Sequence, residues 1–395
     1  MPVVNRIADM QDEVALWRRD LHAHPELMFD LPRTSALVAA RLREFGCDEV
    51  VEGIGICGVV GVIRGRETGS GRVIGMRADM DALPIEEITG LPHASKTPGK
   101  MHACGHDGHT AMLLGAAKYL TETRNFDGVA VVIFQPAEEG GGGGREMVND
   151  GMMDRFGVQE VYGMHNMPGL PVGQFAIRPG PIMAAADHFD IEVEGHGGHA
   201  ARPHACIDTT LVAAQIIVAA QSLVARTVDP VESAVVSITS MHTGGDAYNV
   251  IPQTVALRGT VRTLSPAVQD HVEAKLHALV EHTARAFGAR ATLSYHRNYP
   301  VTINAAAQTG FAGDVAAQVA GEAGVRRDAP PLLGAEDFSF MLNARPGAFI
   351  FTGNGDTAGV HHPAYDFNDA AIPVGMSYWA RLVETAMPAA NGAKA

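Results

Sequence analysis

The chain has 395 residues, of which 46% are hydrophobic and 19% are charged. At about 100 to 200 residues per domain, this length predicts two or three domains, and the apolar fraction argues against bulk disorder. The 44 acidic and 30 basic residues give a net charge of −14, which disfavours nucleic acid and anionic membrane surfaces as partners.

The amino-terminal segment predicts an ordinary helix, because Ile7 to Leu21 repeats apolar residues every three or four positions. It contains no apolar stretch long enough for a signal sequence. The most apolar later segment, residues 211–225, is interrupted by Gln215 and Gln221 and is shorter than the ~20 residues of a bilayer span. We therefore expect a soluble, cytoplasmic protein. The 4 cysteines show no paired spacing, so a special cysteine would be reactive or metal-bound.

The first part of the chain alternates helical and extended patterns. A helix is expected over Thr34 to Phe45, and another begins at Gly108. Runs rich in β-branched residues predict strands that begin at Gly58, Arg72, Gly128 and Glu160. This alternation predicts a mostly parallel or mixed sheet with helices on its faces and functional sites at the carboxyl ends of its strands.

From Asp187 onward the expected order is strand, helix, strand, strand, helix, strand. The two helices cover Ile207 to Arg226 and Pro266 to Phe287. This βαββαβ order is typical of a ferredoxin-like domain. The α/β pattern then resumes, with a short strand over Ala348 to Thr352 and a terminal helix over Ala370 to Met387.

The fold class predicted from these patterns is α/β, with a mixed-sheet domain that is interrupted by an inserted ferredoxin-like domain. The discontinuous domain is expected over residues 1–183 and 298–395, and the insert over residues 184–297.

Two segments at strand ends contain groups that can bind metal. In MHACGHDGHT, extended backbone would place Cys104 and His106 on one side, about 6 to 7 Å apart, where both can reach one metal ion. The segment also fits a buried thiol beside a helix cap, or a nucleophilic cysteine. In QPAEEGGGGG, adjacent side chains diverge, so one of Glu138 and Glu139 can bind a cation while the other faces a metal-bound water. A solvated acidic loop is the alternative.

Two further segments supply histidines. His165 in VYGMHN ends a predicted strand, and His361 and His362 lie in the polar loop VHHPAYDFND. Because adjacent side chains project differently, at most one of the pair is expected to point inward. Together the four segments offer what a hydrolytic centre with two cations needs, which is about five protein ligands and a free base. The predicted ligands are Cys104, His106, Glu139, His165 and His361, with Glu138 as the general base.

These residues occur in a series of motifs, DLHAHPEL, MRADMDALPI, HACGHDGHTAMLLGAA, FQPAEEGGGGG, GMHN, GHGGHAARPH, NVIP, GAEDFS and HHPAYDFND. In this order, over nearly the whole chain, they resemble the metal-dependent amidohydrolases that include hippurate hydrolase, N-acyl amino acid amidohydrolases and auxin-conjugate hydrolases. The resemblance implies a dinuclear catalytic domain and a ferredoxin-like lid that makes a dimer contact. We therefore expect a homodimer or higher homo-oligomer that binds no nucleic acid and no membrane.

The resemblance also implies roles for single residues. Cys104 would bridge the cations, His199 and Asn249 of the lid would hold the substrate or its oxyanion, and Asp79 and Asp81 would lie near the metals.

The last metal ligand is less defined by the resemblance, because relatives often have Asn or Ser where this chain has His362. We prefer His361 as the ligand because of its position two residues before Pro363.

The implied activity is hydrolysis of the amide bond of N-acyl amino acids by a metal-activated water, with Glu138 as the base. The donors are compatible with Zn, Mn, Co or Ni. The acyl group and the amino acid stay open, as does a dipeptidase or carboxypeptidase activity. Two other classes are a metal-free enzyme with Cys104 as nucleophile and a metal-binding scaffold without catalysis.

Overall fold

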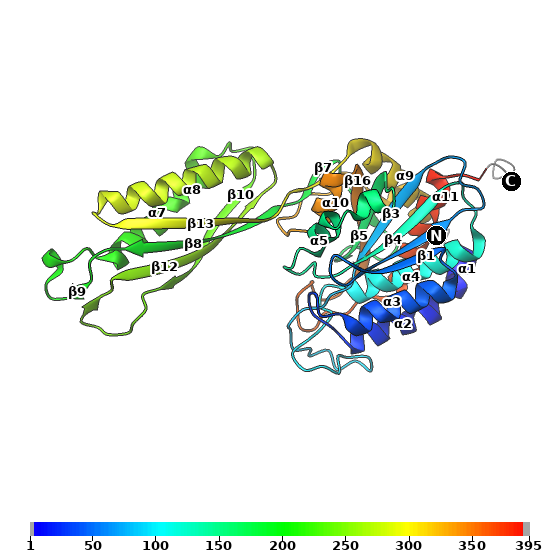
Figure 1. Ribbon diagram of the computed structural model, residues 1–395, viewed down its shortest axis with the longest axis horizontal. Helices are drawn as coiled ribbons and strands as arrows, with labels where there is room; N and C mark the ends of the chain where they lie inside the picture. The colour runs from blue at the N-terminus through cyan, green and yellow to red at the C-terminus, as the bar shows by residue number, and fades with distance from the viewer. Residues whose placement is uncertain (1–3, 390–395) are drawn as a thin grey trace. The chain divides into compact units, whose positions relative to one another are not determined.

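The computed structural model describes residues 4–389, which divide into two compact units (Figure 1). The first unit comprises the chain up to Ile182, the segment Ile303–Pro330 and the chain from Asp337 onward. The second unit comprises Met183–Thr302 and Pro331–Glu336. The roles of catalytic domain and lid stay predictions for these units.

The first unit is built on a mixed sheet of eight strands. Their order is β1 (Glu49–Ile54), β2 (Gly58–Arg64), β4 (Val129–Gln135), β3 (Val73–Asp79), β5 (Glu160–Pro168), β16 (Gly347–Gly355), β6 (Phe175–Ala176) and β15 (Val325–Arg326). The four strands from β4 to β16 are parallel, whereas β1, β2 and β4 pair antiparallel. The central strands are continuous apolar runs because helices cover both faces of the sheet.

The helices of this unit form two groups. In the first, α4 (His106–Thr123) packs against α2 (Gln11–Ala23), α3 (Pro32–Phe45) and α11 (Ile372–Ala386). In the second, α5 (Gly143–Asn149) packs against α10 (Phe338–Ala344) (Figure 1). The remaining helical segments are α1 (Asn5–Asp9), α6 (Met152–Arg155), α9 (Ala306–Ala320) and two short 3₁₀ turns, Glu322–Gly324 and Asp369–Ala371.

The amino-terminal helix differs from its prediction. The apolar spacing from Ile7 to Leu21 predicted one helix, but the chain forms α1 and α2, which meet at Met10. The Met10 amide donates to the Ile7 carbonyl at 3.1 Å, three residues back, so the turn tightens while Met10 stays buried. Both helices still present the predicted apolar residues to the core.

The second unit contains a four-stranded antiparallel sheet. Its order is β10 (Ala234–His242), β12 (Thr254–Thr263), β8 (Ala185–Glu194) and β13 (Arg290–Tyr299). Buried and exposed residues alternate along β8, and the buried face packs against α7 (Thr209–Thr227) and α8 (Pro266–Ala286). This arrangement and the sheet of the first unit confirm the predicted fold class.

Short elements complete the chain. β9 (Gly198–His199) pairs with β11 (Val250–Ile251) near a 3₁₀ turn, Pro203–Ala205. β7 (Gly180–Met183) and β14 (Thr302–Asn304) lie where the chain passes between the units. Within residues 4–389, α7 alone has the length and composition of a membrane-spanning helix, but it packs on a sheet through Val212, Ile216 and Leu223, as core helices do.

Candidate metal centre

The predicted metal ligands lie at one edge of the large sheet. Glu138 and Glu139 follow β4, and His165 lies near the carboxyl end of β5. His361 belongs to the loop after β16. Because β4, β5 and β16 run in the same direction, their carboxyl ends meet at this edge.

Five of the predicted residues form two groups that share the thiol of Cys104. The thiol with His106 and His165 forms one group, and the thiol with Glu139 and His361 forms the other, each with ligand atoms within 4.8 Å of one another. Cys104 Sγ lies 3.4 Å from His165 Nε2, and Glu139 Oε1 lies 3.2 Å from His361 Nε2. A shared thiol between two groups is the arrangement that a bridging ligand requires.

The adjacent glutamates both face His106. Its Nε2 lies 3.9 Å from Glu139 Oε1 and 4.0 Å from Glu138 Oε2. Both backbone amides donate to the carboxylate of Asp81, at 2.9 Å from Glu138 and 3.1 Å from Glu139. Asp81 thereby fixes the loop that presents the two carboxylates.

The donor atoms of each group lie close enough together to bind one metal ion. Tetrahedral zinc with ligands at its usual bond lengths leaves neighbouring ligand atoms about 3.3 to 3.8 Å apart, longer than a hydrogen bond. The ring Nδ1 atoms of His106 and His165 lie 2.8 and 2.7 Å from backbone carbonyls of Asp81 and Asn166. The Nε2 atom of each ring therefore faces the cluster. Among the residues that the structure describes, His106 Nε2 has no hydrogen-bond partner.

The electrostatics also favour a cation. Burial and the carboxylate of Glu139 raise the pKa of the Cys104 thiol well above its usual value. Burial alone would lower the pKa of His106, but Asp79 and Asp81 raise it to about 10. A divalent cation would satisfy the same carboxylates and hold the thiolate. A nucleophilic cysteine needs the opposite, a lowered thiol pKa, so this environment disfavours a metal-free cysteine mechanism.

The structure distinguishes the two adjacent histidines. His361, with a left-handed φ of 66°, points Nε2 at Glu139, whereas His362 Nδ1 accepts the Ala364 amide at 3.0 Å within its own turn. The cluster therefore contains His361 and not His362. The Asp79 carboxylate also lies near, 3.7 Å from His106 Nε2 and 2.6 Å from His109 Nδ1.

His199 and Asn249, the predicted substrate-binding residues, belong to the second unit. They are exposed and adjacent, since His199 pairs with Val250 and the Ala200 amide donates to the Asn249 carbonyl at 2.9 Å. Their role in substrate binding stays a prediction.

Sequence reasoning missed several residues that support the ligands. Asn166 follows His165 and donates to the Cys104 carbonyl at 2.6 Å, while Tyr365 donates to Asn166 Oδ1 at 2.8 Å. Asp107 follows His106, and its carboxylate forms a hydrogen bond with His22 Nδ1 at 2.9 Å. Asn166 and Asp107 each follow a ligand directly, which was a usable signal, but Tyr365 does not, and no spacing rule identified the partners of any of the three.

Comparisons with known proteins show the family of the chain. A model of peptidase family M20/M25/M40 matches residues 75–385. The hippurate hydrolase of Campylobacter jejuni subsp. jejuni is 41% identical over 382 residues, which cover 97% of this chain and 98% of that protein. An N-acetyl-L-cysteine deacetylase of Bacillus subtilis is 41% identical over 356 residues, covering 90% of this chain and 83% of the relative. The solved structure of Bacillus subtilis YXEP, described as a dinuclear metal-binding M20 peptidase, matches with a TM-score of 0.84 at 36% identity, covering 96% of this chain and 99% of that one.

Proposed function

The chain belongs to peptidase family M20/M25/M40 and is a metal-dependent amidohydrolase, and from this premise we propose that it hydrolyses N-acyl amino acids to a carboxylic acid and a free amino acid. The observation that chiefly supports the proposal is the convergence of one thiol, three imidazoles and two carboxylates at one sheet edge. Relatives named for the hydrolysis of hippurate and of N-acetylcysteine support the substrate class.

Two divalent cations are the proposed cofactors. Cys104, His106 and His165 would hold one, and Cys104, Glu139 and His361 would hold the other. Thiolate, imidazole and carboxylate together suit Zn, Mn, Co or Ni. Bound there, the cations would acidify a water molecule and polarise the amide carbonyl.

Glu138 is the proposed general base. Its side chain is largely buried, its backbone is held by Asp81, and it is not needed to complete either ligand group. In the proposed sequence its carboxylate takes the proton from the attacking water and returns it to the nitrogen of the leaving amine. His199 and Asn249 are proposed to bind the substrate or its oxyanion, as the family resemblance implies.

Replacement of Glu138 by Gln tests this role. We expect turnover to fall by about 10²- to 10⁴-fold while the metal content of the purified protein is unchanged. Glu146→Gln is a matched control, because Glu146 follows in the same segment and only pairs with Arg145 at the surface. Full activity of the Glu138 variant would refute the assignment.

The substrate proposal is tested with a panel of N-acyl amino acids and dipeptides, each assayed with Zn, Mn, Co and Ni. Preference for hippurate or N-acetyl amino acids would support it, whereas preference for dipeptides would indicate a peptidase. Activity that survives prolonged chelation but is lost to a thiol reagent would instead support Cys104 as a nucleophile.

We also propose a cytoplasmic homodimer or higher homo-oligomer that associates through the second unit. Residues 209–225 of α7 contain no charged side chain, and most of the helix is not buried within the chain. Val218 is 68% exposed and Leu211 is 49% exposed on this helix. An uncharged, exposed helix face supports association with a second copy, and a monomeric mass in solution would contradict it.

A further inference from the structure

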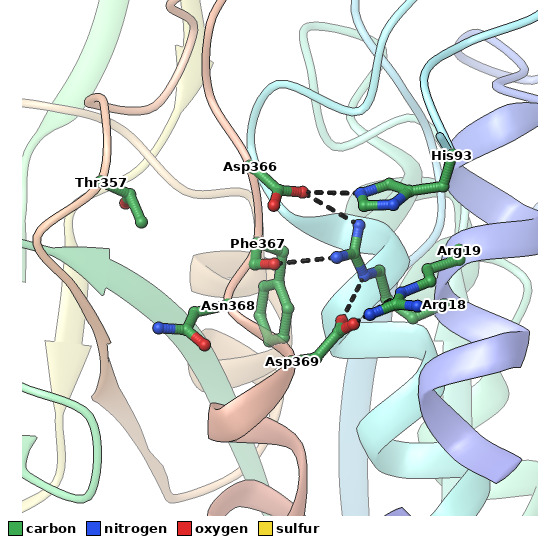
Figure 2. A pocket seen from close by; sticks show the side chains of 8 residues that line it. All are labelled: Arg18, Arg19, His93, Thr357, Asp366, Phe367, Asn368 and Asp369. Carbon is green, nitrogen blue, oxygen red and sulfur yellow. Dashed lines mark hydrogen bonds and ion pairs between the residues drawn. The ribbon is translucent and has the colours of Figure 1, made fainter. Parts of the chain in front are cut away.

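A buried arginine lies behind the ligand cluster. Arg18 of α2 is 1% exposed, and its guanidinium group contacts two segments of the chain, of which Figure 2 shows the carboxyl-terminal loop. Toward the carboxyl-terminal loop, Nε donates to Asp369 Oδ1 at 2.7 Å, and one terminal nitrogen donates to the Phe367 carbonyl at 2.9 Å. The other terminal nitrogen lies 3.2 Å from Asp366 Oδ1 and 3.5 Å from Asp107 Oδ2.

Both segments also carry predicted metal ligands. Asp107 directly follows His106 at the start of α4, and residues 366–369 follow His361 in the same loop. Arg18 therefore joins a ligand segment of the first group to a ligand segment of the second. The Phe367 ring packs against the same turn of α4, where a Cβ on Gly108 would lie 2.3 Å from its atoms.

The geometry suits arginine specifically. Three carboxylates and one carbonyl meet the side chain, and they are shared among all three guanidinium nitrogens. A guanidinium group offers five N–H donors in a rigid fork, whereas a lysine ammonium offers a single point of charge. Without the arginine, Asp107 would keep the imidazole of His22 at 2.9 Å but would lose the guanidinium charge, which is costly for a buried carboxylate.

The second ligand group depends on this contact more than the first does. Cys104 is bonded through its carbonyl to Asn166, and His106 is bonded to Asp81, both independently of Arg18. His361 has a left-handed backbone, and its side chain is 52% exposed. Three contacts hold its loop. The His361 amide donates to the Ala103 carbonyl at 2.7 Å, Tyr365 donates to Asn166, and Arg18 binds residues 366–369.

We propose that Arg18 is a positioning residue that fixes the His361 loop against the start of α4 and thereby sets the affinity of the cation site formed by Cys104, Glu139 and His361. The inference rests on the proposed dinuclear centre. Residues that orient metal ligands typically change metal affinity by about 10- to 100-fold when they are replaced.

The test is metal titration of the full-length, metal-stripped enzyme by calorimetry, with Arg18→Met, Arg18→Lys and the control Arg19→Met. Arg19 is the next residue of α2, is 49% exposed and makes one ion pair with Asp369. We expect one of two metal equivalents to bind about 10- to 100-fold more weakly in Arg18→Met, with a smaller loss in Arg18→Lys and none in Arg19→Met. The same equivalent should be lost in His361→Asn.

The outcomes separate this inference from the proposed function. A wild-type enzyme that takes up no metal would overturn the dinuclear centre itself. A wild-type enzyme with two sites, whose folded Arg18→Met variant binds both equivalents normally or loses both equally, would overturn the role of Arg18. If Arg18→Met does not fold, Asp366→Asn decides, because its side chain is 33% exposed. Normal binding of the second equivalent by that variant would refute the inference.

Discussion

At the scale of single residues, Gly105 separates two predicted ligands, Cys104 and His106, and it has a left-handed φ of 91°. A Cβ at this position would lie 2.4 Å from Asn166 Nδ2 and from the Tyr365 hydroxyl. Only glycine allows the ligand segment to approach the side chains that hold it.

Gly105→Ala is therefore expected to lower both stability and metal affinity. The control Gly46→Ala isolates the backbone cost, because Gly46 has a φ of 84° and a Cβ there would meet none of the described residues within 4 Å. In denaturant unfolding, we expect the control to lower the free energy of unfolding by about 1 to 2 kcal/mol. Gly105→Ala should lower it by clearly more. Equal losses would show that the close approach is unimportant.

His22 gives the site region a pH dependence. Its side chain is fully buried, which alone would lower its pKa, but the carboxylates of Asp107, 2.9 Å from Nδ1, and of Glu87, 3.4 Å from Nε2, raise the pKa to about 9. A histidine with a raised folded pKa contributes stability that is complete below its unfolded pKa of about 6.5 and is lost as pH rises through about 9. We expect the free energy of unfolding to fall by about 3 kcal/mol across this range.

Urea unfolding at pH 6 and pH 9.5 measures this effect as a difference between wild type and His22→Gln. The variant should lose most of the fall in stability, whereas His24→Gln, at a partly exposed position two residues later, should keep it. If the free energy of unfolding of His22→Gln fell between pH 6 and pH 9.5 as much as that of the wild type, His22 would not be the source of the pH dependence.

The site was predictable where chemistry follows chain order. Glu138 and Glu139 were selected for residue type and position after a strand, and Cys104 and His106 for residue type and spacing before a helix. The extended backbone expected between Cys104 and His106 is wrong, because His106 begins α4 and Gly105 has a left-handed φ. The supporting contacts were not predictable, because they join distant positions. Asp81 is 57 residues from Glu138, and Arg18 is 351 residues from Asp369. Without a fold, such pairs have no spacing rule.

At the scale of elements, periodicity predicted those that are long enough to show it. β8 alternates buried and exposed residues from Asp187 to Glu194, and α7 and α8 show helical spacing over about twenty positions. The two-residue strands β6, β9, β11 and β15 are too short for any period, and tertiary pairing alone defines them. The break at Met10 was missed because both helices keep one apolar face.

The start of α7 provides a test at this scale. Asp208 caps the helix, and its carboxylate accepts the amides of Thr210 at 3.0 Å and Leu211 at 3.2 Å. Asp208→Ala should reduce stability by about 1 kcal/mol, because these amides lose their acceptor at the helix end. Asp208→Asn preserves the cap and should have little effect in denaturant unfolding. Equal destabilisation by both variants would indicate that charge matters here and the cap does not.

At the scale of the whole molecule, each unit has its own apolar core. One core includes Trp379, Phe134 and Leu113, and the other includes Phe189, Ile191 and Leu276. The βαββαβ order in the sequence indicated this division. The membership of Pro331–Glu336 in the second unit followed from no pattern, since this segment returns to it after 28 residues of the first unit, Ile303–Pro330.

Because all the proposed metal ligands lie in the first unit, metal removal should act on that unit. Ligand binding to the folded state at a hundredfold excess over Kd contributes about 2.7 kcal/mol per site. We expect chelation to accelerate amide hydrogen exchange in α4 and β5, which contain His106 and His165, while β10 and β12 of the second unit keep their rates. Added Zn or Mn should restore the slow exchange, and Cys104→Ser should weaken the response because it replaces the ligand shared by both groups. Two results would contradict this prediction: unchanged exchange rates in α4 and β5 after chelation, or an equal acceleration in β10 and β12. Either would show that the cations do not specifically stabilise the unit that contains their proposed ligands.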